Sequence, residues 1–240
     1  MDDLIDTSPP DIMTYQNYRQ QTLNSLSGIK SENTLIEEFV IMTKRKEIPK
    51  EWIFAFFGSL EIDEKNKSYK NFEELKKFIY GVAEVIGLMI AKIINLPKKS
   101  YPMARSLGES MQLINILRDI DEDLLLGRVY LPQDEMKRFH IKNLFHKDKT
   151  NQLGLKEIIK FQICRINLLQ KKAVSGFKYI PSEYLVAIKT ASDIYFLISQ
   201  KINHNPLFVM KKRVKPSLWE VISIMLKNFI VIKLVKKKYE

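Results

Sequence analysis

The sequence predicts an all-α protein with a single domain. A chain of 240 residues suits one domain and buries about three-quarters of the surface that its unfolded form exposes. It contains only 8 glycines and 9 prolines, and no alternating run bounded by turn signals has the pattern of a strand. Apolar residues recur with the period of a helix, between breaks at proline and glycine.

These breaks divide the chain into helices joined by short connections. Pro9 ends the first segment, Pro49 separates the third from the fourth, and Pro97 precedes the sixth, which Gly127 and Pro132 close. Short connections favour antiparallel neighbours in a single helical bundle. The expected helices cover residues 2–6, 12–26, 32–45, 50–60, 72–95, 101–126, 152–175, 182–203 and 217–238.

The formal net charge is +11, and the basic excess is concentrated near the C-terminal end. Residues 217–240 are therefore interpreted as a basic C-terminal helix or tail. Such clusters are either solvated or attract an anionic lipid surface, a diphosphate or nucleic acid. No nucleic-acid recognition motif accompanies them, so nucleic acid is not an expected partner. The clusters are Lys211, Lys212, Arg213 and Lys215, then Lys233, Lys236, Lys237 and Lys238.

Cysteine usage and the N-terminal sequence indicate the compartment. The single cysteine, Cys164, excludes an internal disulfide and a cysteine-based zinc site, and we expect it to be buried. The N-terminus is acidic, unlike a signal peptide. The apolar stretches 82–96 and 218–235 both contain charges, so neither is a convincing membrane span. We expect a cytoplasmic protein, with peripheral membrane contact through the basic C-terminal region as an option.

The predicted helix 101–126 carries an unusual polar stripe. At about 100° per residue, five of its residues fall within an arc of roughly 60°, and apolar residues lie on both sides. A surface helix would show one apolar stripe and a broad polar face, so this narrow stripe predicts the lining of an internal cavity. The five residues are Gly108, Gln112, Asn115, Asp119 and Asp123.

Two carboxylates on this stripe are spaced for a metal ion. Asp119 and Asp123 lie one turn apart, and such a like-charge pair is destabilising unless a cation is nearby. Mg²⁺ suits this arrangement, because carboxylates, phosphate oxygens and water complete its ligand set. Gln112 and Asn115 would then bond the substrate or the coordinated waters. The alternative is a solvated acidic helix end that Arg118 neutralises.

A second pair, Asp2 and Asp6, also lies four residues apart at the start of the chain. By itself it is better explained as favourable negative charge near a helix N-terminus. Together with Asp119 and Asp123, it predicts a site in which carboxylates from two facing helices hold metal ions around a diphosphate.

These residues belong to strings that resemble a known family. The string Gly108–Asp123, followed by 127–132, resembles the second aspartate-rich signature of squalene and phytoene synthases. The residues from Asp2 to Asp6 are similar to the first aspartate-rich motif, and Phe78–Gly87 to the helix in which a tyrosine precedes a Val-Ala…Gly pattern. Tyr195 matches a cavity tyrosine on a late helix. The resemblance extends to about residue 214.

One departure from the family lies at the N-terminus. Family members carry further helices before the first aspartate motif, whereas Met1 directly precedes Asp2 here. Residues 1–240 are therefore expected to be an N-terminally truncated squalene/phytoene synthase-like domain. Its catalysis would be weakened or lost unless another chain supplies the missing helices.

The resemblance implies an isoprenoid-synthase-type helical bundle around a central cavity. Asp2, Asp6, Asp119 and Asp123 would bind Mg²⁺. The activity would be Mg-dependent head-to-head condensation of two prenyl diphosphates, farnesyl or geranylgeranyl. It would pass through a cyclopropylcarbinyl diphosphate to a C30 or C40 product such as squalene or phytoene. NADPH would be required only if the product is squalene.

The resemblance also suggests roles for single residues. Tyr80 and Tyr195 would shape the cavity and stabilise cationic intermediates, unless they are ordinary core tyrosines. Arg118 and Arg213 would pair with phosphate oxygens. The alternative functions are a non-catalytic family member that acts as a membrane-associated assembly or interaction protein, and an inactive truncated remnant.

Overall fold

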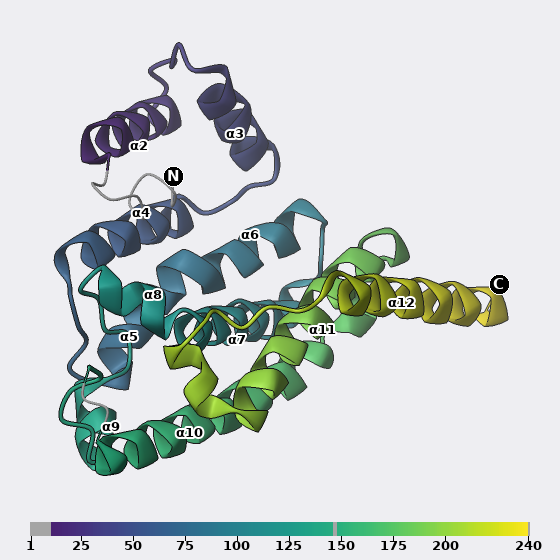
Figure 1. Cartoon of the computed structure of the whole chain (residues 1–240). Helices are drawn as coiled ribbons and strands as arrows, with labels where there is room; N and C mark the ends of the chain where they lie inside the picture. Colours follow the sequence, from purple (N-terminus) through teal and green to yellow (C-terminus); the bar gives the residue numbers. More distant parts are fainter. Residues whose placement is uncertain (1–10, 146–147, 240) are drawn as a thin grey trace.

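The computed structural model describes residues 11–145 and 148–239, which form the all-α bundle in Figure 1. Within these residues the extended backbone amounts to one isolated bridge, between Ser68 and Val129. The predicted fold class is confirmed. The expected segment 2–6, with Asp2 and Asp6, lies outside the described residues.

The helices follow the predicted order, with one short helix, α9, that the periodicity missed. The α2–α3 hairpin lies beside α4, whereas α7 lies between α6, α10 and α11 (Figure 1). Short 3₁₀ turns span Lys98–Ser100, Phe177–Tyr179 and Pro206–Met210. The α-helices are α2 (Ile12–Leu26), α3 (Thr34–Arg45), α4 (Lys50–Lys65), α5 (Phe72–Ile79), α6 (Val85–Ile93), α7 (Tyr101–Arg118), α8 (Ile120–Leu125), α9 (Gln133–Arg138), α10 (Lys149–Val174), α11 (Ser182–His204) and α12 (Leu218–Tyr239).

Side-chain caps explain why several helices begin where they do. The Oδ1 atom of Asn33 accepts hydrogen bonds from the amides of residues 35 and 36 at 3.0 and 3.3 Å. Asn71 caps α5 by accepting from the amide of Glu74 at 2.9 Å, and Asp148 caps α10 through the amide of Asn151 at 2.9 Å. Each cap satisfies a backbone N–H that has no partner within its helix.

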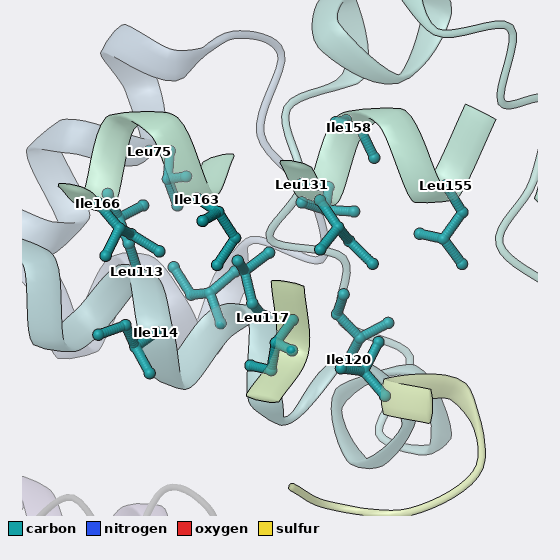
Figure 2. Packing of buried hydrophobic residues seen from close by; sticks show 14 of the residues in the cluster. Leu75, Leu113, Ile114, Leu117, Ile120, Leu131, Leu155, Ile158, Ile163 and Ile166 are labelled. Atoms are coloured by element: carbon teal, nitrogen blue, oxygen red, sulfur yellow. The ribbon is translucent and has the colours of Figure 1, made fainter. Parts of the chain in front are cut away.

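The core consists of two apolar clusters. The larger one joins α5, α7, α8 and α10, and Figure 2 shows Leu113 and Leu117 of α7 beneath Ile163 and Ile166 of α10. The smaller one joins α2, α3, α4 and α6 around Tyr15 and neighbouring aliphatic side chains. Helix α7 is thus buried along one face by α10, which leaves its polar stripe to face the other side of the bundle.

The expected continuous helix 72–95 is interrupted by a π-helical turn, Tyr80–Glu84, between α5 and α6. A π-turn inserts one extra residue into the helical repeat, so side chains on either side change face relative to a regular helix. The 3.6-residue periodicity cannot indicate such a turn. Its position matters because it packs directly against α7.

The expected helix 101–126 also breaks, at Asp119, where φ is −104° and ψ is 11°. Backbone bonds from the Asp119 amide to the Asn115 carbonyl, and from the Asp123 amide to the Asp119 carbonyl, keep α7 and α8 nearly in line. Adjacent side chains on a regular helix do not face each other. The local deviation accompanies a paired contact between Arg118 and Asp119 that a regular helix would not allow.

The expectation that Cys164 is buried is wrong, because its side chain is exposed on α10. Its neighbours Ile163 and Ile166 face the core, and a rotation of about 100° per residue turns Cys164 outward. Within the described part of the chain, no helix combines the length and apolar character needed to span a bilayer.

Candidate active site

A cavity of about 390 Å³ lies between α6, α7, the end of α10 and α11. Helix α7 lines it on successive turns with Met103, Leu107 and Met111, which share one helical face. Its wall is mostly apolar, and its volume is in the range of small-molecule sites. The predicted central cavity is therefore present, with one wall on the helix that carries the polar stripe.

The two ends of this cavity differ in character. Gln112 and Tyr195 line one end, whereas Leu96 and Phe177 line the other. From Ser100, which directly precedes α7, to Gln112 the lining extends about 18 Å at 1.5 Å per residue. This shape suits an elongated apolar chain with a polar group at one end.

Glycines bring the walls of the cavity into close contact. A Cβ atom at Gly108 would lie 2.3 Å from the carbonyl oxygen of Ala83 in the π-turn. A Cβ at Gly87 would lie 2.5 Å from the carbonyl oxygen of Ala104. Both clashes are with backbone atoms, which cannot rotate away. Two glycines, one on each helix, thus set the distance between the α6 wall and α7.

Beyond the polar end of the cavity lies a group of charged side chains. Arg118 donates from Nε and Nη2 to the two carboxylate oxygens of Asp119, at 2.8 and 2.6 Å. Arg213, in the segment before α12, lies with Nε 3.0 Å from Oδ1 of Asp119 and with Nη1 3.0 Å from Oε2 of Glu122. One carboxylate therefore holds two guanidinium groups, which brings residues almost 100 positions apart into one site.

The surroundings of Arg118 favour its charged form. Burial opposes the charge of Arg118, but its hydrogen bonds to Asp119 and its contact with Tyr195 raise the pKa of the guanidinium. The Arg118 side chain is only 14% exposed. A charge-assisted fork of this kind is suited to a phosphate group.

Asn115 lies one turn before Asp119. Its Nδ2 atom donates to Oε1 of Gln112 at 3.3 Å, which fixes the orientation of both amides. Its Oδ1 atom is buried and has no hydrogen-bond partner. A buried carbonyl oxygen of this kind is costly unless a ligand, water or ion satisfies it.

These residues fit a magnesium ion that is held jointly with a diphosphate. Across 11–145 and 148–239, no group of three or more His, Cys, Asp and Glu side chains could hold a metal ion unaided. Mg²⁺ typically uses one or two carboxylates together with phosphate oxygens and water. The Asp119 carboxylate and the unpartnered Oδ1 of Asn115 are oxygen donors of the right kind.

The structure brings together most of the described residues that the sequence predicted for the site. Gln112, Asn115, Arg118, Asp119 and Arg213 form the contacts described above, and Tyr195 lies between the cavity and Arg118. Asp123 of α8 lies one turn beyond Asp119 and faces the segment 128–131.

Tyr80 is not brought to the cavity. It packs against the smaller core cluster, and Arg105 lies over its ring at 5.3 Å from the centroid. Arg105 also donates to the buried Glu84 at 2.6 Å. The π-turn accounts for this position, because the extra residue separates the face of Tyr80 from that of residues 82, 83 and 86, which line the cavity.

Sequence reasoning missed one buried polar cluster near the site. Asp63 of α4 is 5% exposed and is bonded by Tyr130 and Arg128, which directly follow α8. One signal was available: Asp63 follows the core residue Leu60 by three positions, which places a carboxylate on an apolar helix face.

A sequence model of the squalene/phytoene synthase family matches residues 1–220. The chain belongs to the squalene/phytoene synthase family. Its members are prenyltransferases, and at the level of the family the match supports head-to-head prenyl condensation. The resemblance inferred from the aspartate-rich strings is confirmed.

Curated members of the family match part of the chain. The chloroplastic phytoene synthase of an Oncidium hybrid cultivar is 36% identical over 126 residues, which is 49% of this chain and 30% of that protein. Phytoene synthase 1 of Solanum lycopersicum is 32% identical over 163 residues, 64% of this chain and 39% of that protein. The chain thus spans well under half the length of these relatives.

Solved structures of the family share the fold. A dehydrosqualene synthase in complex with ligand aligns over 97% of this chain and 82% of its own, with a TM-score of 0.82 and 23% identity. The squalene synthase HpnC from Alicyclobacillus acidocaldarius aligns over 80% of this chain and 73% of its own, with a TM-score of 0.70 and 17% identity. At these identities the likeness supports the isoprenoid synthase fold alone.

Proposed function

We propose that this chain binds prenyl diphosphates and joins two of them head to head, in a magnesium-dependent reaction, to a C30 or C40 product. The observation that carries this proposal is the apolar cavity, one end of which leads through Gln112 and Tyr195 to the Arg118–Asp119–Arg213 cluster. A prenyl diphosphate has the same two parts, a long apolar tail and a charged head.

The charged cluster would receive the diphosphate. Arg118 and Arg213 now share the carboxylate of Asp119, and a diphosphate offers each of them a stronger anionic partner. Asn115, through its unpartnered Oδ1, and Gln112 would orient the head group or its waters. Mg²⁺ bound with the Asp119 carboxylate would supply Lewis-acid stabilisation of the departing pyrophosphate. The arginines would hold the same oxygens as charge develops on them.

The cavity would receive the prenyl tail and exclude water from the allylic cation. Its wall is aliphatic over most of its length, so few groups could capture a carbocation. Tyr195 lies where the head group and tail meet, and its ring could stabilise positive charge there. Tyr80 does not line this cavity, so of the two tyrosines predicted from the sequence only Tyr195 has a role in the proposal. NADPH would be needed only for a squalene product.

The experiment that tests this proposal is product formation from labelled farnesyl and geranylgeranyl diphosphates with Mg²⁺, with and without EDTA. The informative variant is Ala191→Phe, because Ala191 lies on α11 one turn from Tyr195, lines the cavity and is exposed. A phenyl ring at this position would block the path of the tail. We expect product formation to fall about 100-fold while the melting temperature is retained.

Ala187→Phe is the matched control. Ala187 is the exposed alanine one turn earlier on α11, and it lines a separate groove next to α12 rather than the cavity. It should leave product formation within about twofold of the wild type. A folded wild-type chain that forms no product with either substrate would contradict the proposal, as would equal activity of the two variants.

We also propose peripheral contact with an anionic membrane through α12. On this helix Trp219, Leu226 and Ile230 fall within about 40° of arc, and they are 78%, 50% and 53% exposed. The opposite side faces α11, where Nδ2 of Asn228 donates to Oδ2 of Asp193 at 2.8 Å. The outward face is therefore an apolar surface with no protein partner among the described residues.

The charge around this face favours lipid over a second copy of the chain. The exposed lysines of this region are Lys211, Lys212, Lys215, Lys227 and Lys233. Each lysine near an anionic bilayer contributes about 1 kcal/mol, whereas two copies of this face would repel each other. Aromatic and aliphatic side chains framed by lysines are typical of helices that lie in a membrane interface.

Leu226→Glu should weaken binding to vesicles of phosphatidylcholine and phosphatidylglycerol by about tenfold, because a charge replaces an inserted apolar side chain. Co-sedimentation measures this effect, and binding should also decrease with salt. Leu35→Glu on α3, where Leu35 is 80% exposed, is the control and should bind like the wild type. Equal binding of the two variants, or a dimer that Leu226→Glu dissociates, would contradict membrane contact through α12.

A further inference from the structure

Asp63 is a buried carboxylate held by three side chains. The Tyr130 hydroxyl donates to it, with its oxygen 2.7 Å from Oδ1 and 2.9 Å from Oδ2. The Tyr69 hydroxyl donates to Oδ1 at 3.4 Å, and Nη1 of Arg128 lies 3.4 Å from Oδ2. Burial and the Asp63 charge raise the pKa of Tyr130, so this hydroxyl keeps its proton and remains a donor. A buried carboxylate needs such donors to stay ionised.

Two of these donors belong to the segment that directly follows α8. Gly127 adopts a left-handed conformation with φ of 71°, which ends the helix, and the Arg128 amide then bonds the carbonyl oxygen of Asp123 at 2.8 Å. The charge of Asp123 also reaches the Tyr130 hydroxyl and contributes to the raised pKa of that group. Arg128 and Tyr130 thus connect Asp63 to the segment that Asp123 faces.

The same segment is fixed on its other side by the connection between α4 and α5. The amide of Val129 bonds the carbonyl of residue 67 at 2.8 Å, and the amide of Gln133 bonds that of Tyr69 at 2.9 Å. The Tyr130 ring stacks on Tyr69 and Phe78 with centroid distances of 5.8 and 5.5 Å. These contacts place the Tyr130 hydroxyl and the Arg128 guanidinium at Asp63, which adds a side-chain anchor to those of the backbone.

We propose that Asp63 is a positioning residue for the aspartate end of the site. It holds Arg128 and Tyr130, and through them it sets the orientation of α8 and of the Asp123 carboxylate beside Asp119. Asp63 does not line the substrate cavity, so it acts through these residues rather than on the substrate. The inference rests on the proposed function, and it adds Asp123, a metal ligand predicted from the sequence, to the diphosphate and metal site.

The test compares Asp63→Asn with Glu135→Gln. Glu135 on α9 is also a buried carboxylate, 8% exposed, but its partners are Arg165 at 2.8 Å and Gln162 of α10. Two measurements apply to both: amide hydrogen exchange across residues 119–131, and the affinity for Mn²⁺ with inorganic pyrophosphate. Tyr130→Phe is a milder third variant, because it keeps the ring stacking and the Arg128 ion pair.

We expect Asp63→Asn to increase exchange in residues 119–131 about tenfold and to weaken Mn²⁺ binding about tenfold. Tyr130→Phe should also increase exchange and weaken Mn²⁺ binding, but by less than Asp63→Asn. Glu135→Gln should alter exchange in α9 and α10 and leave Mn²⁺ affinity unchanged. Equal loss of Mn²⁺ affinity in Asp63→Asn and Glu135→Gln would indicate general destabilisation and overturn the inference.

The exchange measurement separates this inference from the proposed function. If the wild type binds no Mn²⁺ with pyrophosphate, the proposed function is contradicted. In that case amide exchange by itself tests the positioning role of Asp63. Unchanged exchange in residues 119–131 of Asp63→Asn would overturn this role, and a local increase would support it.

Discussion

Replacement of Asp119 by asparagine is expected to lower product formation by about 10²- to 10³-fold. The substitution preserves the size of the side chain but removes the negative charge between Arg118 and Arg213. It also releases Arg118 and Arg213 from the anion that they share. Steady-state product formation with Mg²⁺ and labelled prenyl diphosphates measures the loss.

The affinity of Asp119→Asn for pyrophosphate is expected to rise, whereas its activity is expected to fall. In EDTA, without a metal, the two released guanidinium groups should bind inorganic pyrophosphate more tightly than in the wild type. Isothermal titration calorimetry measures this affinity. Glu122→Gln is the control, because Glu122 is 50% exposed and its ion pair with Arg213 lies at the edge of the cluster. Its activity should fall only a few-fold. If Asp119→Asn had wild-type activity, the Asp119 carboxylate would not be required for catalysis.

Replacement of Gly108 by alanine should destabilise the fold by about 3 kcal/mol, a large effect for one methyl group. The new Cβ would lie 2.3 Å from the carbonyl oxygen of Ala83 and 3.2 Å from the Cα of Glu84. Both neighbours are backbone of the π-turn, so α7 and this turn would have to separate. Urea denaturation followed by circular dichroism measures the free energy of unfolding.

Gly58→Ala on α4 is the matched control. Gly58 also lies inside a helix, but no atom lies within 4 Å of an added Cβ there. Alanine should stabilise this helix by about 0.5–1 kcal/mol, because it restricts the unfolded chain more than glycine does. The same substitution, glycine to alanine, is therefore expected to lower the free energy of unfolding at position 108 and to raise it at position 58. Similar stability of the two variants would mean that α7 and the π-turn are not in contact.

The function of the charged cluster follows from a competition between anions. Asp119 binds both arginines when no diphosphate is present, which keeps two cations from being left uncompensated in a partly buried site. A diphosphate with its metal offers more negative charge and more acceptor oxygens than one carboxylate. Under the proposed function the arginines would exchange Asp119 for the diphosphate, and Asp119→Asn tests that exchange.

Much of the site could be predicted from the spacing of residues on one helix. Gln112, Asn115 and Asp119 were assigned to one face by the helical period, and the structure brings this face to the cavity and the arginines. Arg118 follows from its position beside Asp119. The metal-ligand roles of Asp2 and Asp6 stay a prediction, because these residues lie outside the described part of the chain.

Other features depend on contacts between distant segments, and local patterns carry no signal for them. The position of Tyr80 follows from a π-turn packed against α7, and the position of Asp63 from a cluster with residues 128 and 130. Arg213 reaches Asp119 only because the chain returns past α8 before α12 begins.

The amino-acid sequence was sufficient to predict the all-α class, the approximate bounds of the long helices, the family, and the face of α7 that carries the polar stripe. These follow from short-range physics: helical periodicity, capping side chains and breaks at proline and glycine act within a few residues. Three features could be seen only in the folded structure: the position where helix 101–126 bends, the tyrosine that lines the cavity, and the cations that contact Asp119. These features depend on packing and charge pairing between residues tens of positions apart. Such interactions form only when the distant segments come together in the folded protein.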